Sequence, residues 1–559
     1  MKLSFKFILL FLSVSFFIAG CDGEEGSLVN ARLENNPPPE APETDPGSAD
    51  FSNYVAIGNS LTAGFMDAAL YNLGQNSSLG AQLANQLASV GGQESFNQPD
   101  INSELGFNTA VTQPPTGTVL GRFKLDTNIP GPSPTIGGDP IGAFGGSKAN
   151  LDNFGVPGIL LGQLLTPATG GPASPQNPAF NPFYQRFAST PGSSTILGDA
   201  IAAQPTFFTL WIGNNDVLGY ALSGATTNGL LTSQQAFQQQ FGAVINSLMT
   251  QTSASGVVGT IPPVLAIPVF RAVPYNSIEL DEQTAIALNQ AFGGLNQALD
   301  AIVQFLGHDA DDAERRKVSY QAGNNPVLIK DPQLEDIGPK FDQLQQFGAI
   351  SAEQRAALQP FVQSRPMEVN PQTGPELLLL SAAQVLGTLA DPNNPQSQIG
   401  VVIPLAPQFH LTASNIIEIE TARATFNAII EATVQSANQG GTRLALFDAN
   451  AADGAFADIF GLSDGQPGIE INGTPLAPDF SPNGVFSTDG VHPNPRGTAI
   501  LANEFIRAIE ETFNAKIPEV EVLRLPTTQL CAGDCVSQQA AKTAISDAET
   551  LLPGNLSSQ

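Results

Sequence analysis

Short apolar runs alternate along the chain with longer segments that carry apolar residues at helical spacing. Strand-like runs occupy residues 53–58, 206–213, 256–261 and 442–448, and a shorter run ends near Asn153. Helical spacing recurs at residues 233–251, 282–305, 413–438 and 494–515, and a helix-like segment at residues 61–70 follows the first strand. Such alternation predicts a parallel sheet with helices on both of its faces.

Candidate chemistry follows two of these strands. Residues 58–61 (Gly-Asn-Ser-Leu) end the first run, so Ser60 is expected where a strand turns into a helix, a turn that exposes the hydroxyl and leaves backbone N–H groups free. Residues 213–216 (Gly-Asn-Asn-Asp) end another run. Because sites in open parallel sheets form outside the carboxyl ends of the strands, Ser60, Gly158 and Asn215 are expected at one edge.

A candidate general base lies in residues 489–493 (Asp-Gly-Val-His-Pro). Asp489 and His492 are three residues apart, so one tight turn can bring the carboxylate to the imidazole Nδ1–H and direct Nε2 toward Ser60. The chain has 3 histidines, and only His492 has a carboxylate in this local relation. His308 and His410 are expected to be surface or packing residues.

These stretches resemble blocks I, III and V of the SGNH (GDSL) hydrolases, in that family's order. Residues 153–158 (Asn-Phe-Gly-Val-Pro-Gly) resemble block II. The resemblance implies a three-layer α/β/α sandwich with a parallel, flavodoxin-like sheet. It also implies that Ser60 is the nucleophile, that His492 is the base oriented by Asp489, and that the N–H groups of Ser60 and Gly158 with the Asn215 side chain form the oxyanion hole.

Simpler interpretations of the separate motifs stay open. Each motif is also a common turn, and glycine and proline punctuating a loop explain residues 153–158 about as well as block II does. Asn59 stands where the family usually has Asp, which puts a supporting role of that carboxylate in doubt. The four motifs in the family's order favour the hydrolase.

The N-terminus predicts export and anchoring. Residues 1–21 combine Lys2 and Lys6 with an apolar stretch and end in Ile-Ala-Gly-Cys, which resembles a bacterial lipobox with Cys21 as the lipidated residue. An ordinary secretory signal with an incidental cysteine is the alternative. Residues 22–50 are rich in Pro, Glu, Asn and Gly and predict a disordered tether. The expected location is the cell envelope, at the outer membrane or cell surface.

Two long spacings between the motifs predict insertions in a hydrolase domain at residues 51–515. The first insertion, about 72–148, predicts irregular structure, and the second, about 309–400, includes a helical part at 339–387 interrupted near 366–374. They could form a lid or wall over the site, or be extra scaffold. A C-terminal tail, residues 516–559, contains Cys531 and Cys535, which could close a small disulfide loop.

Composition narrows the class of partner. The chain has 559 residues, of which 42% are hydrophobic, and a formal net charge of −29, which argues against nucleic acid or anionic membrane surfaces as partners. No metal or cofactor is expected, and the acidic residues 308–312 predict a solvated loop. The sequence thus predicts a membrane-anchored serine esterase acting on lipid, glycan or other small-molecule esters through an acyl-enzyme. The alternatives are a non-catalytic surface lipoprotein on a hydrolase scaffold and a secreted protease.

Overall fold

The computed structural model describes residues 43–110, 118–128, 131–462 and 465–536. The chain divides into residues 1–43 and a compact unit of residues 44–559. The predicted signal, Cys21 and the tether up to residue 42 therefore lie outside the described residues. Within the described ranges, no helix has the length and apolar character needed to cross a bilayer.

The centre of the second unit is a sheet of five parallel strands, which confirms the predicted mixed α/β class. Its order is β15 (Leu444–Phe447), β6 (Ser255–Gly259), β5 (Phe207–Trp211), β1 (Tyr54–Gly58) and β4 (Asn153–Gly155). The expectation that the short strand ends near Asn153 is wrong, because pairing with β1 begins there: the Ala56 N–H donates to the Asp152 carbonyl.

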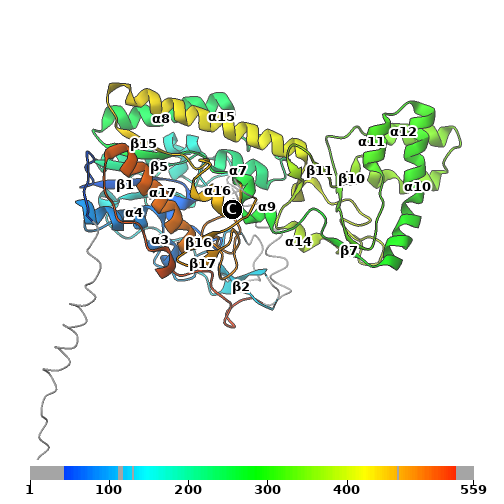
Figure 1. Cartoon of the computed structure of the whole chain (residues 1–559), viewed down its shortest axis with the longest axis horizontal. Coiled ribbons are helices and arrows are strands. Elements are labelled where there is room, and N and C mark those ends of the chain that lie inside the picture. Colours follow the sequence, from blue (N-terminus) through cyan, green and yellow to red (C-terminus); the bar gives the residue numbers. More distant parts are fainter. Residues whose placement is uncertain (1–42, 111–117, 129–130, 463–464, 537–559) are drawn as a thin grey trace, which may run out of the picture. The chain divides into compact units, whose positions relative to one another are not determined.

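Helices pack against the sheet through two separate hydrophobic clusters. Along β1, Val55 and Ile57 belong to one cluster, and Tyr54 and Ala56 belong to the other, as the period of two in a strand requires. The first cluster includes residues of α8 (Gln234–Gln251) and α15 (Ala413–Ala437), which lie side by side in Figure 1. The second includes residues of α4 (Leu79–Leu87) and α17 (Pro495–Phe513).

The segment after Ser60 differs from the prediction. The expected helix at 61–70 is only one turn long, α2 (Ser60–Ala63), because Gly64 adopts a left-handed φ of 78°. A Cβ at this position would lie 2.2 Å from the Gly74 carbonyl oxygen, so only glycine fits. Asp67 and Ala68 are also left-handed, with φ of 54° and 60°. The chain therefore turns sharply beside Ser60.

The first insertion is more regular than expected. It contains α3 (Asn72–Asn76), α4 and a hairpin of β2 (Leu120–Asp126) and β3 (Gly131–Ile136). The polar composition hid the helical spacing of three buried leucines in α4, at positions 79, 83 and 87. The C-terminal tail binds this hairpin, since the Cys531 N–H donates to the Leu125 carbonyl at 2.9 Å. Cys531 and Cys535 form a disulfide.

The second insertion has a hydrophobic cluster of its own, with members from Ile278 to Leu405. Its helices α11 (Ala310–Arg316) and α12 (Gly338–Gln346) are grouped in Figure 1 with α10 (Glu282–Leu306), which precedes the predicted start of the insertion near residue 309 but belongs to the same cluster.

Two expectations for this region are wrong. The helical part at 339–387 is interrupted earlier than expected, from the end of α13 (Ala352–Ala357), by short strands such as β10 (Ser364–Pro366), where proline removes a helical donor. A helix returns at α14 (Ala382–Val385). The predicted solvated loop at 308–312 enters α11, which Asp309 caps by accepting from the Asp312 N–H.

Candidate active site

Ser60 is the first residue of α2 and lies directly beyond the carboxyl end of β1. The Asn59 side-chain oxygen accepts a hydrogen bond from the Leu61 N–H at 3.1 Å, so an amide does here what a carboxylate cap would do. Within the described part of the chain, the Ser60 N–H donates to no other group. The turn therefore holds the hydroxyl in place and leaves a backbone donor beside it.

The structure brings Ser60, His492 and Asp489 together, and these three residues are called the triad cluster below. His492 Nε2 lies 2.9 Å from Ser60 Oγ, and His492 Nδ1 lies 2.9 Å from Asp489 Oδ2. Ser60 and His492 are both 7% exposed. The Phe65 ring meets the imidazole edge to face, with the ring centroids 5.1 Å apart. The arrangement can pass a proton from the hydroxyl to an imidazole whose other nitrogen is fixed by a carboxylate.

Both carboxylate oxygens of Asp489 accept two hydrogen bonds each. Its Oδ1 accepts from the Val491 and His492 N–H groups, both at 2.9 Å, and its Oδ2 accepts from the Ala68 N–H at 3.0 Å as well as from the imidazole. Burial raises the pKa of Asp489, but the charge of His492 and these hydrogen bonds outweigh burial and lower the pKa to about 2. The carboxylate is therefore ionised at neutral pH.

A support for Asp489 that the sequence did not indicate comes from Asp67. Its carboxylate accepts from the Thr488 N–H at 2.9 Å and forms an ion pair with Arg122 at 3.3 Å. Asp67 also fixes the left-handed turn that presents the Ala68 N–H to Asp489. No local motif signals this arrangement, because Arg122 and Thr488 are distant from Asp67 in sequence.

Gly158 and Asn215 line the same pocket as Ser60 and His492. Gly158 has a φ of 76°, a conformation that side chains disfavour, and within the described residues its N–H donates to no other group. The Asn215 side-chain amide donates to the Ile159 carbonyl at 2.8 Å, which ties α7 (Asn215–Leu222) to the loop that carries Gly158. The second amide hydrogen of Asn215 remains for a ligand.

Asp216, the last residue of the Gly-Asn-Asn-Asp motif, fixes the same loop from inside the protein. Its carboxylate accepts from the Leu161 N–H at 2.9 Å and from the Thr232 hydroxyl at 2.7 Å. Burial raises the pKa of Asp216 to about 6, although these hydrogen bonds lower it. Asn215 and Asp216 thus hold the Gly158 loop at two successive points.

The other two histidines lie apart from this pocket, and both are buried. His308 contacts Asp312, with Nε2 and Oδ2 2.6 Å apart. His410 Nε2–H donates to the Lys330 carbonyl at 3.0 Å, and His410 Nδ1 is buried without a partner among the described residues. Burial lowers the pKa of His410 to about 4. Its free nitrogen therefore reaches no reacting group.

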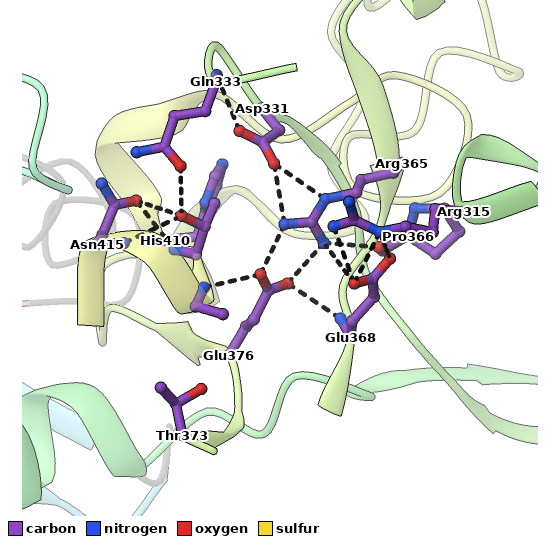
Figure 2. Close-up of polar contacts among 12 residues, drawn as sticks. Arg315, Asp331, Gln333, Arg365, Pro366, Glu368, Thr373, Glu376, His410 and Asn415 are labelled. Carbon is purple, nitrogen blue, oxygen red and sulfur yellow. Dashed lines mark hydrogen bonds and ion pairs between the residues drawn. The ribbon is translucent and has the colours of Figure 1, made fainter. Parts of the chain in front are cut away.

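Near His410 lies a second buried set of ionic side chains, the arginine cluster, made of Arg365, Asp331 and Glu376. Figure 2 shows Arg365 between the two carboxylates. Its Nη1 and Nη2 donate to Glu376 at 2.8 and 2.6 Å, and its Nε donates to Asp331 at 2.9 Å. Glu376 also accepts from the Ala413 N–H, at the start of α15. The cluster joins the second insertion to a helix of the central part.

Comparison with known proteins does not identify the chain: no family model, no curated protein and no solved structure matches it. Within the described residues, no group of three or more His, Cys, Asp or Glu side chains is placed to hold a metal ion. The triad cluster, Gly158 and Asn215 are the groups in this pocket that could take part in a reaction.

Proposed function

We propose that this protein is a serine ester hydrolase of the SGNH (GDSL) type, tethered to the cell envelope through Cys21. The observation that carries the proposal is the continuous hydrogen-bond chain from Ser60 through His492 to Asp489, with both links at 2.9 Å. Ser60 Oγ attacks the ester carbonyl carbon while His492 Nε2 takes its proton, and His492 then protonates the leaving alcohol. Water releases the acyl group by the same steps.

The oxyanion of each tetrahedral intermediate is held by the N–H groups of Ser60 and Gly158 and by the Asn215 amide. Asp489, ionised because its pKa is about 2, keeps the imidazole in the tautomer that accepts at Nε2. Since Asp216 and Asn215 anchor the Gly158 loop, the donors are fixed before the substrate binds.

The fold supports the same proposal. With the strands numbered one to five along the chain, the sheet order is two-one-three-four-five, which is that of flavodoxin-like doubly wound sheets. The two clusters on alternate residues of β1 fit a three-layer α/β/α sandwich. In such sheets the ligand binds beyond the carboxyl ends of the strands, where Ser60 follows β1.

A fluorophosphonate probe tests the nucleophile, because it phosphonylates an activated serine. We expect one adduct on the wild-type protein, located at Ser60 by peptide mass spectrometry, and none on Ser60→Ala. We expect matching turnover of p-nitrophenyl esters by the wild-type protein alone. Absence of both adduct and turnover would favour a non-catalytic binding protein, and cleavage of peptides in preference to esters would favour a protease.

A further inference from the structure

The pocket above Ser60 is apolar on most sides. Its walls include Phe65, Phe123, Phe183, Leu218, Leu222 and Leu380, which come from the central part and from both insertions. The cavity has a volume of about 100 Å³, taken as the space that the centre of a water molecule can occupy. Among the described residues that line it, Asp489 is the only carboxylate and none is Lys or Arg. Because Asp489 is committed to four hydrogen bonds, the walls offer a substrate no free charge.

Helix α7 provides one continuous apolar wall that begins at the oxyanion donor. Leu218 and Leu222 follow Asn215 by three and seven residues, so all three lie on one face of the helix. At 1.5 Å per residue this face extends about 10 Å from Asn215 to Leu222. An acyl chain whose carbonyl oxygen bonds to Asn215 can therefore follow the helix surface.

Another wall is the β2–β3 hairpin, which is held in a fixed position. The Phe123 N–H donates to the Asp67 carbonyl at 2.8 Å, and the neighbouring Arg122 pairs with the Asp67 carboxylate. The C-terminal tail binds both strands, because Cys531 donates to Leu125 and Val536 donates to Pro134, each at 2.9 Å. The ring of Phe123 thus lines the pocket from a hairpin that hydrogen bonds hold in place.

The polar groups in the pocket do not suit a sugar. The Thr488 hydroxyl donates to Asp67 at 2.6 Å, and the Thr109 hydroxyl donates to the Ala68 carbonyl at 3.2 Å. Ser381 is left with a buried hydroxyl that has no partner among the described residues. One such group is too few for the several hydroxyls of a saccharide, each of which costs free energy when buried without a partner.

We infer that the site takes an ester whose acyl part is an extended apolar chain, with Leu218 of α7 and Phe123 of the hairpin as specificity-determining side chains. This inference rests on the proposed hydrolase function. Burying one methylene of the chain between these walls is expected to raise kcat/KM by roughly fourfold. An acetyl group is too short to follow the α7 wall from Asn215 to Leu222.

The first test is a series of p-nitrophenyl esters with acetyl, butanoyl, octanoyl and dodecanoyl groups, below their micellar concentrations, together with an acetylated xylose. We expect kcat/KM to rise at least about a hundredfold from acetyl to octanoyl. A preference for the acetyl ester, or fastest release of acetate from the sugar, would overturn the inference while leaving the hydrolase in place.

The second test is Leu218→Gln, with Leu446→Gln as the matched control. Leu446 packs against the same hydrophobic cluster but does not line the pocket. The ratio of octanoyl to acetyl kcat/KM cancels any loss of folded protein. We expect this ratio to fall about tenfold in Leu218→Gln and to stay unchanged in Leu446→Gln. Equal ratios in both variants and the wild type would exclude the α7 wall as the acyl site.

A binding measurement keeps the two hypotheses distinct. Ser60→Ala is titrated with dansyl-undecanoic acid, and fluorescence reports entry of the chain into the pocket. We expect binding to weaken about tenfold when Leu218→Gln is added to Ser60→Ala. If the wild type hydrolyses no ester while this difference holds, the hydrolase proposal fails and the acyl site stands. If the difference is absent, the acyl site fails.

Discussion

The triad cluster and the arginine cluster both bury charged side chains, but they use hydrogen bonds differently. In the arginine cluster, the hydrogen bonds of Arg365 end at the buried carboxylates of Asp331 and Glu376. Burial lowers the pKa of Arg365, yet Glu376 and Asp331 together raise it above its ordinary value. In the triad cluster the chain of bonds ends at Ser60, which lines an open pocket.

Two of the buried histidines, His492 and His410, repeat this contrast. His492 has a carboxylate on one nitrogen and the serine hydroxyl on the other, whereas His410 has a backbone carbonyl on one nitrogen and no partner from the described residues on the other. The hydrogen bonds of His492 therefore lead through Ser60 to a pocket, whereas those of His410 do not. Mutations should distinguish the two clusters. Those in the triad cluster should affect turnover, and those in the arginine cluster should affect the free energy of unfolding.

The largest expected effect is on turnover. Ser60→Ala and His492→Ala should each lower kcat by about 10⁴-fold or more, and the double variant should be little worse, because the residues act as one unit. Asp489→Asn should be equal or milder. Ester hydrolysis and circular dichroism of the same samples check this. His308→Ala and His410→Ala are the controls, and a comparable loss of turnover in either would mean that His492 is not the base.

Arg365→Met should affect stability instead. It leaves Asp331 and Glu376 buried without their cation, which is expected to cost about 3–5 kcal/mol of unfolding free energy. Arg315→Met is the control, since Arg315 is 48% exposed and its ion pair with Glu368 should be worth about 1 kcal/mol or less. Urea unfolding measures both. Loss of kcat per folded molecule in Arg365→Met would show that the arginine cluster supports catalysis directly.

Asn215→Ala should lower kcat about a hundredfold with little change in KM, because the amide bonds the oxyanion mainly in the transition state. The neighbouring Asn214→Ala is the control, as the Asn214 side-chain oxygen is buried without a partner among the described residues. Steady-state kinetics on one ester gives both constants. A raised KM with unchanged kcat would make Asn215 a residue that binds the ground state.

The sequence predicted the parts of the site that are local. The three-residue spacing of Asp489 and His492 and the position of Ser60 after a strand are short-range features, and the structure places them in one chain of hydrogen bonds. Alternating apolar runs likewise predicted the parallel sheet. Each of these signals depends on neighbouring residues or on a regular period.

What the sequence missed depends on contacts between distant residues. The helix after Ser60 ends at Gly64 because the Gly74 carbonyl lies against it, and the Ala68 N–H reaches Asp489 across more than 400 residues. The polar composition of the first insertion concealed the hairpin. Both strands of this hairpin form backbone hydrogen bonds with the C-terminal tail. Contacts between distant segments of this kind produce no repeating pattern of apolar residues in either segment.

Asp216 combines features of the two clusters. It is buried like Asp331, but it supports the Gly158 loop beside the triad cluster. Its folded pKa of about 6 lies above the model-peptide value of 3.8, so the folded state favours the protonated form. The cost of ionisation is absent below about pH 4 and grows as the pH rises through 6, reaching about 3 kcal/mol at most.

Asp216→Asn should therefore exceed the wild-type stability by only about 1 kcal/mol near pH 4.5 and by up to about 3 kcal/mol at pH 7.5. Turnover should change only a fewfold, because the amide oxygen can still accept from Leu161 and the amide nitrogen can donate to Thr232. Asp216→Ala, which removes both contacts, is the control and should lower kcat more. Denaturant unfolding at the two pH values decides the matter: an equal stability difference at both would mean that Asp216 does not titrate in this range.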